Sequence, residues 1–198
     1  MKRAGDVALS AAGLVATAPL QALVAAAVLV SDGRPVFFRQ ARPGKDSKVF
    51  ELVKFRSMRP IAGDHESDAD RLTRIGSFLR STSLDELPTL WNVLKGEMSL
   101  VGPRPLLVEY LERYSPEQAR RHDVRPGVTG LAQVAGRNGL SWDEKLALDV
   151  RYVDTWSLAL DLRILLRTIP AVMARRGVSQ EGHATMSEFQ GSAGVEHG

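Results

Sequence analysis

The fold of this chain is decided by one stretch, which reads Ser81-Thr82-Ser83-Leu84-Asp85-Glu86-Leu87-Pro88-Thr89-Leu90-Trp91-Asn92-Val93-Leu94-Lys95-Gly96. Ser83 and Glu86 have the spacing of a capping box, which predicts a helix that begins at Leu84. Gly96 is expected to end this helix. The apolar residues in between recur at helical spacing and should form one face: Leu87, Leu90, Trp91 and Leu94.

Asp85 and Glu86 lie in the first turn of the expected helix. There the helix macrodipole and the unpaired N–H groups stabilise an ionised carboxylate, and the same groups bind phosphate. Two acids in a first turn are also ordinary helix-start chemistry. The pair alone therefore leaves two interpretations open, a reactive site and a plain helix start, and the rest of the chain has to separate them.

The composition is typical of one globular domain, and its basic pI is compatible with a partner that carries phosphate groups. The chain has 198 residues, of which 44% are hydrophobic and 25% are charged, and this length allows one compact domain with a real core. Cysteine is absent, which excludes disulfides, a thiolate nucleophile and zinc–thiolate sites. A pI near 9.4 suits nucleic acid, anionic lipid or a nucleotide, and the net charge of +3 does not choose among them.

The N-terminal segment is long enough to enter a membrane, because Val7–Ser31 contains no charged residue and roughly 20 apolar residues span a bilayer. A secretory signal fits poorly, since the run is too long and lacks a clear cleavage site. Length favours a single spanning helix, but Pro19 interrupts the segment and both flanks are basic. A re-entrant helix, broken at Ala18-Pro19 with both ends on the cytoplasmic side, accommodates both facts. Thr17 could then bond a carbonyl freed by the break.

The middle of the chain is expected to contain a β-hairpin. Its two strands and its turn should occupy residues 35–40, 49–55 and 42–47 respectively. Lys54 and Arg56 lie at alternate positions and share a face, which is either solvated or one side of an anion site. Asp68-Ala69-Asp70 matches the D-x-D pattern of metal-dependent glycosyltransferases, but so short a match in a polar loop is weak and we interpret it as solvent-exposed. A helix is expected to follow and to end at Arg80.

Arg104 lies between Pro103 and Pro105, and a residue in this position has a tightly restricted backbone. A guanidinium held still can grip a phosphate with two parallel hydrogen bonds, although a rigid surface turn would have the same sequence. His122 has no acid or nucleophile suggested beside it, so we interpret it as structural or solvated.

The remaining elements are expected mostly as helices. We expect an amphipathic helix over 106–114, helices after the capping boxes that begin at Ser115 and Ser141, and a short strand over 131–134. Residues 158–176 are apolar but carry four arginines, which favours an interfacial helix over a spanning one, with core packing as the alternative. Residues 177–198 read as a polar, poorly packed tail.

Six motifs together resemble the bacterial sugar transferase family. They are Gln40-Ala41-Arg42-Pro43-Gly44, Lys54-Phe55-Arg56-Ser57-Met58, Leu84-Asp85-Glu86-Leu87-Pro88, the segment 92–99, Gly102-Pro103-Arg104-Pro105 and the segment 125–134. This is the family of monotopic phosphoglycosyl transferases, and the chain is similar to its minimal, single-domain form, typified by N,N′-diacetylbacillosamine-1-phosphate transferases. The resemblance runs from about Lys2 to Phe189, and its motifs are long and ordered.

The resemblance implies a definite reaction. A sugar-1-phosphate, expected to be that of an N-acetylated amino sugar, passes from a UDP-sugar to polyprenol (undecaprenyl) phosphate with release of UMP. The family forms a covalent aspartyl-phosphosugar, so Asp85 is implied as the nucleophile and Glu86 as a second catalytic residue that helps to hold Mg²⁺. The candidates for phosphate and uridine contacts are Lys54, Arg56, Arg80, Arg104, Arg125 and Arg137.

The resemblance also implies an α+β, mostly helical fold at a membrane. Residues 1–31 would form the re-entrant membrane helix, 32–176 the catalytic domain with its β-hairpin and amphipathic interfacial helices, and 177–198 the polar tail. The protein would be monotopic, on the cytoplasmic face of the bacterial inner membrane and in contact with its lipid. It departs from a typical member at the helix break, where Ala18-Pro19 replaces Ser-Pro.

Three other functions are weaker on the sequence. A membrane-anchored nucleic-acid binder would explain the pI, but the chain has no nucleic-acid-binding motif, so no nucleic acid is expected as a partner. A non-catalytic scaffold has no use for Asp85 beside Glu86. An aspartyl phosphatase would need a D-x-D-x-[TV] pattern, which the sequence lacks.

Overall fold

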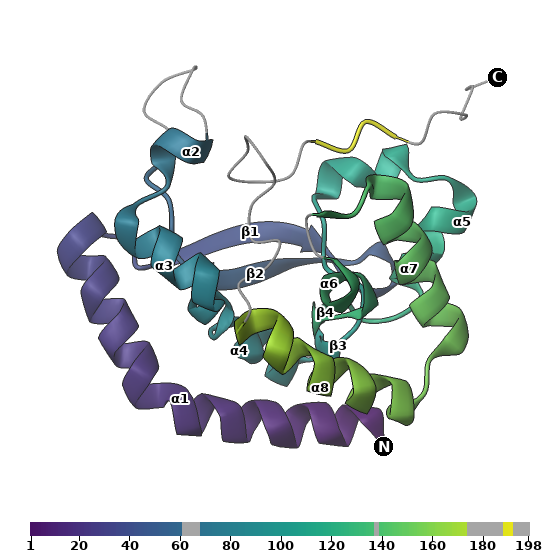
Figure 1. The fold of residues 1–198 in the computed structure, drawn as a ribbon, viewed down its shortest axis with the longest axis horizontal. Coiled ribbons are helices and arrows are strands. Elements are labelled where there is room, and N and C mark those ends of the chain that lie inside the picture. Colours follow the sequence, from purple (N-terminus) through teal and green to yellow (C-terminus); the bar gives the residue numbers. More distant parts are fainter. Residues whose placement is uncertain (61–67, 137–138, 174–187, 192–198) are drawn as a thin grey trace.

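The structure is a computed structural model that describes residues 1–60, 68–136, 139–173 and 188–191 (Figure 1). It is mostly helical, as expected, with two small two-stranded sheets. The α-helices are α1 Lys2–Asp32, α2 Asp68–Arg71, α3 Arg74–Thr82, α4 Thr89–Lys95, α5 Pro116–Ala119, α6 Leu131–Ala135, α7 Trp142–Thr155 and α8 Leu158–Met173. The strands are β1 Phe37–Pro43, β2 Val49–Phe55, β3 Ser99–Val101 and β4 Gly127–Thr129, and the 3-10 helices are η1 Lys45–Ser47, η2 Leu84–Glu86, η3 Val108–Arg113 and η4 Arg120–His122.

The expected hairpin is present, because β1 and β2 pair antiparallel along their whole lengths. Helix α4 is fastened to β2 by side chains. Asn92 is fully buried, and its amide accepts from Val53 N at 3.2 Å and donates to Glu51 O at 2.7 Å. Thr89 donates to the Val53 carbonyl at 3.1 Å. These bonds satisfy backbone groups of β2 and hold the segment before α4 beside Lys54.

The second sheet fixes the loop that carries the Pro-Arg-Pro sequence. β3 and β4 run parallel, with Ser99 opposite Gly127. The loop after β3 begins at Gly102, which packs so closely on β4 that a Cβ on Gly127 would lie 2.1 Å from the Gly102 nitrogen. Only glycine permits this approach of two backbones. The residues that follow Gly102 therefore leave the sheet from a fixed point.

Helix α1 runs along the outside of the domain and bends sharply part of the way along (Figure 1). It contains Pro19, and sharp bends in helices are almost always at proline. Thr17 donates to the Gly13 carbonyl at 2.7 Å, whereas the carbonyl that Pro19 leaves without its helical partner is that of Val15. Thr17 therefore does bond a backbone carbonyl, but the predicted partner is wrong: it reinforces the turn before the break.

Both ends of α1 are bound to the same domain. Near its start, Lys2 pairs with Asp161 of α8 at 2.5 Å, and Arg3 donates to the last carbonyls of α4 at 2.6 and 2.8 Å. At its other end, the buried Arg56 donates to the Asp32 carbonyl and to the two carbonyls that follow it. Between these two attachments the helix packs against α4 and α3, and its Val24 and Val28 are buried in a core cluster with Phe55 and Leu79.

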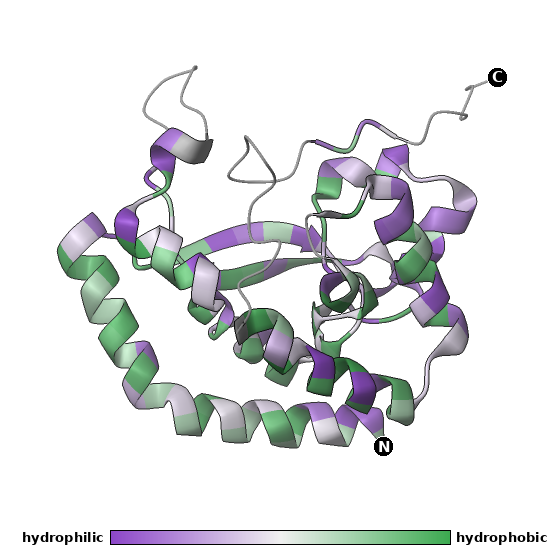
Figure 2. Ribbon diagram, in the orientation of Figure 1, coloured by the Kyte–Doolittle hydropathy of each residue, from purple (hydrophilic) through white to green (hydrophobic). Residues whose placement is uncertain are grey.

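Helices α1 and α8 are rich in apolar residues, as the colouring of Figure 2 shows, and many of these side chains are exposed. α1 has the length of a helix that can cross a membrane, with a mean hydropathy of 2.0 over its most apolar 18 residues. α8 is amphipathic, as predicted: Asp161 and Ile164 are buried. Its exposed side is an apolar stripe at spacings of three and four residues, made of Leu158, Leu162, Leu166 and Ile169.

The predicted helix start at Leu84 is wrong. Leu84–Glu86 form the 3-10 helix η2, and α4 begins only at Thr89, because Pro88 has no N–H and favours the beginning of a helix. Gly96 ends α4 in the left-handed conformation, as predicted. The apolar face predicted for this helix is not its core face, since Trp91 is 55% exposed and the buried residues are Thr89, Asn92 and Val93.

Two other expectations fail. Residues 131–134 belong to helix α6 instead of a strand, since the run is too short for its spacing to distinguish the two. The region 106–114 contains the 3-10 helix η3 and no α-helix. Most of the tail expected over 177–198 lies outside the described residues, but within 188–191 Phe189 is 1% exposed and joins a core cluster with Tyr110 and Leu146.

Candidate active site

The local backbone places Asp85 and Glu86 between two helices. Ser83 ends α3 with φ 57°, a left-handed conformation, and η2 begins directly after it. The capping box predicted from Ser83 and Glu86 does not form, because the Ser83 side chain makes no cap bond and the Glu86 carboxylate points to cations. The acid pair therefore lies on a single tight turn, and its surroundings come from other elements of the fold.

Glu86 is the point at which three elements meet. Its Oε1 accepts a hydrogen bond from Lys54 Nζ of β2 and another from Arg104 Nη2 of the Pro-Arg-Pro loop, both at 2.7 Å. Burial acts to raise the pKa of Glu86, but the positive charges of Arg104 and Lys54 outweigh it and hold that pKa well below its usual range. Glu86 is therefore an ionised carboxylate that accepts charge-assisted bonds from two cations.

Asp85 has the opposite character. Its side chain is buried, and no residue within the described ranges donates a hydrogen bond to its carboxylate. Burial, together with the negative charge of Glu86, raises the pKa of Asp85 to about 6, although Lys54, Arg104 and Arg80 act in the other direction. Adjacent acids with pKa values pushed apart are typical of a reactive pair. Asp85 is left unpaired in a field of positive charge, which suits attack on a phosphorus atom.

The structure brings four of the predicted residues together, namely Asp85, Glu86, Lys54 and Arg104. Arg80 lies near enough to influence Asp85, while its guanidinium donates to Ser57 Oγ at 3.0 Å.

The other predicted cations lie elsewhere. Arg56 donates to carbonyls after α1, as described above. Arg125 donates to the Gly96 carbonyl at 2.8 Å, at the end of α4. Arg137 lies outside the described residues. Arg56 and Arg125 thus hold backbone in this structure.

Two further basic residues near Arg104 were missed by the sequence analysis. Burial and the charge of Arg104 lower the pKa of Arg42 to about 10 and that of Lys145 to about 8. Arg42 lies in the motif Gln40-Ala41-Arg42-Pro43-Gly44, so its position in this motif could have identified it as a candidate site residue. Lys145 lies on α7 with its ammonium 5.3 Å from the Trp142 ring centre, and no local pattern indicates it.

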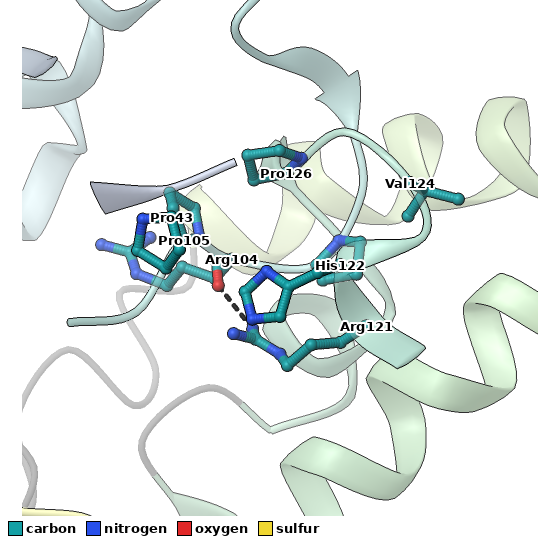
Figure 3. Close-up of a pocket in the computed structure, with 8 residues that line it drawn as sticks. Pro43, Arg104, Pro105, Arg121, His122, Val124 and Pro126 are labelled. Atoms are coloured by element: carbon teal, nitrogen blue, oxygen red, sulfur yellow. Dashed lines mark hydrogen bonds between the residues drawn. The ribbon is translucent and has the colours of Figure 1, made fainter. Parts of the chain in front are cut away.

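His122 is structural, as interpreted from the sequence. It is buried, its Nδ1 lies 3.3 Å from the Gly44 carbonyl oxygen, and burial lowers its pKa to about 4. It lines a slight hollow behind Arg104, which Figure 3 shows. The hollow has no room for a water molecule, so we interpret it as a packing gap.

The described side chains near Asp85 offer Mg²⁺ a small set of oxygen ligands. Among the described residues, no group of three or more His, Asp or Glu side chains could hold a metal ion. Both cations at Glu86 contact Oε1, and Oε2 has no described partner. Because Mg²⁺ often takes one or two carboxylates and completes its shell with phosphate oxygens and water, Glu86 Oε2 is a suitable ligand.

The fold and the site define a buried pair of adjacent carboxylates, with Lys54 and Arg104 bonded to one of them, on a domain with one long apolar helix. The sequence model of the bacterial sugar transferase family matches residues 1–175, and the chain belongs to this family.

Curated relatives agree with this assignment. The chain is 48% identical to the uncharacterized sugar transferase EpsL of Bacillus subtilis, over 98% of each chain. It is 40% identical to the exopolysaccharide production protein ExoY of Sinorhizobium fredii, over 89% of this chain and 87% of that one. It is 42% identical to the UDP-glucose:undecaprenyl-phosphate glucose-1-phosphate transferase of Caulobacter vibrioides, over 87% of this chain and 69% of that one.

The Glu86 interactions can be tested by stability. Glu86→Gln leaves Lys54 and Arg104 without an anionic partner, so the free energy of unfolding should fall by about 1–3 kcal/mol. Glu51→Gln is the matched control, because Glu51 pairs with Arg39 in an exposed salt bridge. This change should lower the free energy of unfolding by less than about 1 kcal/mol. Denaturant unfolding in detergent measures both. Equal losses would contradict the special role of Glu86.

Proposed function

We propose that this protein transfers a sugar-1-phosphate from a UDP-sugar to undecaprenyl phosphate and releases UMP, as the first membrane step of glycoconjugate assembly. The observation that carries the proposal is the Asp85 carboxylate, which has no partner among the described residues and lies beside Glu86, whose charge is balanced by Lys54 and Arg104. Membership of the bacterial sugar transferase family supports it, as do relatives named undecaprenyl-phosphate glucose-1-phosphate transferases.

Two displacements at one phosphorus atom account for the reaction. An Asp85 oxygen attacks the phosphorus that carries the sugar, an aspartyl-phosphosugar bond forms, and the bond to UMP breaks. An oxygen of the lipid phosphate then attacks the same phosphorus, which frees Asp85 and leaves the sugar on a lipid diphosphate. In this scheme Lys54 and Arg104 neutralise charge that develops on the phosphoryl oxygens. The two cations are held ready by Glu86, so little reorganisation is needed when substrate binds.

Mg²⁺ is the cofactor that we propose. When bound, it would neutralise the diphosphate and help UMP to leave. Glu86 is the residue that would hold it, through the oxygen that does not contact Lys54 and Arg104.

The sugar is less constrained than the reaction. The N-acetylated amino sugar expected from the sequence remains a prediction, while the names of relatives specify UDP-glucose in Caulobacter vibrioides and UDP-galactose in Erwinia amylovora. We therefore propose only a UDP-sugar as donor, with the three sugar types as candidates.

We propose that the protein is monotopic and lies on the cytoplasmic face of the bacterial inner membrane. A lipid acceptor requires access to the membrane, and the exposed apolar surfaces of α1 and α8 support contact with lipid. A helix with both ends bound to one domain and a bend between them is compatible with re-entry. The basic residues at both flanks favour the cytoplasmic side.

UMP release tests the function. Purified protein should release UMP from at least one of UDP-glucose, UDP-galactose and UDP-N-acetylglucosamine in the presence of undecaprenyl phosphate and Mg²⁺. Asp85→Asn should lower the rate by roughly a thousandfold or more, because a neutral amide cannot form the acyl phosphate. Asp123→Asn, at an exposed acid, is the control and should be near wild type. Normal turnover by Asp85→Asn would remove Asp85 from the mechanism.

Arg104 can be tested with a change that keeps its charge. Arg104→Lys retains a cation but loses the planar fork, so turnover should fall by about tenfold or more. Arg39→Lys replaces an exposed arginine of β1 and should change turnover less than about twofold. We would abandon the phosphate role of Arg104 if the two variants behaved alike.

Topology can be tested with single cysteines, because the chain contains none. Ala4→Cys and Ser31→Cys lie near the two ends of α1, and both should react with an impermeant maleimide from the cytoplasmic side only. Val15→Cys, at a side chain 77% exposed, should stay unlabelled until detergent is added. Labelling of Ala4→Cys and Ser31→Cys from opposite sides would mean a spanning helix. Pro19→Ala should shift the helix toward that state.

A further inference from the structure

The backbone of Arg104 is held by a second arginine. Arg121 Nη2 donates to the carbonyl oxygen of Arg104 at 2.6 Å, the bond drawn in Figure 3. Pro103 and Pro105 have no N–H, so the turn has few groups of its own with which to anchor. The Pro103 carbonyl accepts from the Gly127 nitrogen at 2.9 Å. The donation from Arg121 fixes the next carbonyl along, which is that of Arg104 itself.

Arg121 is itself tightly held. Its side chain is 2% exposed and pairs with the buried Asp149 of α7, at 3.1 Å from Nε and 2.7 Å from Nη2. Its Nη1 lies 3.2 Å from the Tyr114 hydroxyl, and its guanidinium carbon lies 5.6 Å from the centre of the Tyr114 ring. Every nitrogen of the guanidinium is engaged, so the group has one orientation.

A buried ion pair is a costly way to join two elements. Desolvation of both charges offsets much of their attraction, and apolar side chains of similar size often stabilise as well. If Arg121 only fastened η4 to α7, its bonds to Asp149 would be sufficient. Nη2, which already bonds Asp149, also donates to the one residue of the Pro-Arg-Pro turn that contacts Glu86.

We propose that Arg121 is a positioning residue for Arg104, held in orientation by Asp149. It fixes the backbone of Arg104, and with it the position of the Arg104 side chain. The Arg104 guanidinium then stays beside Glu86 and the substrate phosphate while negative charge develops on the phosphoryl oxygens. This inference rests on the proposed function. Because Arg121 acts only through Arg104, replacing Arg121 should lower kcat in a protein that has Arg104. In a protein that already lacks Arg104, replacing Arg121 should leave kcat unchanged.

A double-mutant cycle tests this. Arg121→Met with Asp149→Leu removes both buried charges and leaves neither unpaired. In the native background the pair of changes should lower kcat by about tenfold or more, as measured by release of radiolabelled product. In the Arg104→Ala background the same pair should change kcat less than about twofold.

The neighbouring surface pair provides a matched control on the same two elements. Arg120 of η4 pairs with Asp154 of α7, and both side chains are substantially exposed. Arg120→Met with Asp154→Leu should leave kcat near wild type in both backgrounds. Arg121→Lys is measured in parallel, in case the double variant folds poorly. It keeps a charge beside Asp149 but loses the fork that reaches the Arg104 carbonyl, and it should show the same dependence on Arg104.

Two results would overturn the proposal. The first is an equal fractional loss of kcat with and without Arg104, which would make Arg121 a general support of the fold. The second is unchanged kcat in the Arg121 variants with only a lower melting temperature. Failure of the proposed function would look different, since the wild-type protein itself would then release no UMP from any UDP-sugar.

Discussion

The structure depends on the Glu86 carboxylate and its two cations. Lys54 comes from a strand, Arg104 from a loop after a second sheet, and Glu86 from a tight turn between helices, and one oxygen atom joins all three. Because this carboxylate already balances both cations, no cation in the described part of the chain is bonded to Asp85 beside it. The division of labour between two adjacent acids thus follows from which of them the cations contact.

The same short helix connects this site to α1. α4 has seven residues; it begins just after Glu86, and its last carbonyls accept from Arg3 near the start of α1. Asn92 and Thr89 fasten α4 to β2, the strand that carries Lys54. If α1 lies in the membrane as proposed, this rigid unit fixes the height of the carboxylate pair relative to the lipid. A lipid phosphate and a nucleotide could then meet at one place.

Local sequence predicted local structure well and the site only in part. The hairpin, the Gly96 terminator and the capping boxes at Ser115 and Ser141 are confirmed, because each depends on residues close in the chain. The capping box at Ser83 failed because tertiary partners outcompeted it: the Glu86 carboxylate binds Lys54 and Arg104. Arg121 gave no signal, since its role depends on contacts with Arg104 and with Asp149, 28 residues away. The burial of Phe189 was not predicted, because a single aromatic residue in a polar segment gives no sign that it packs against the core.

The most direct test of this account is the mass of the protein after a single turnover without lipid. Wild-type protein incubated with a UDP-sugar that it uses and Mg²⁺ should gain the mass of one phosphosugar on the peptide that contains Asp85. UMP should appear in equal amount before any undecaprenyl phosphate is added. The adduct should be absent from Asp85→Asn and should disappear when the lipid is supplied. UMP release that begins only with the lipid, with no adduct on Asp85, would contradict a covalent route and indicate direct displacement.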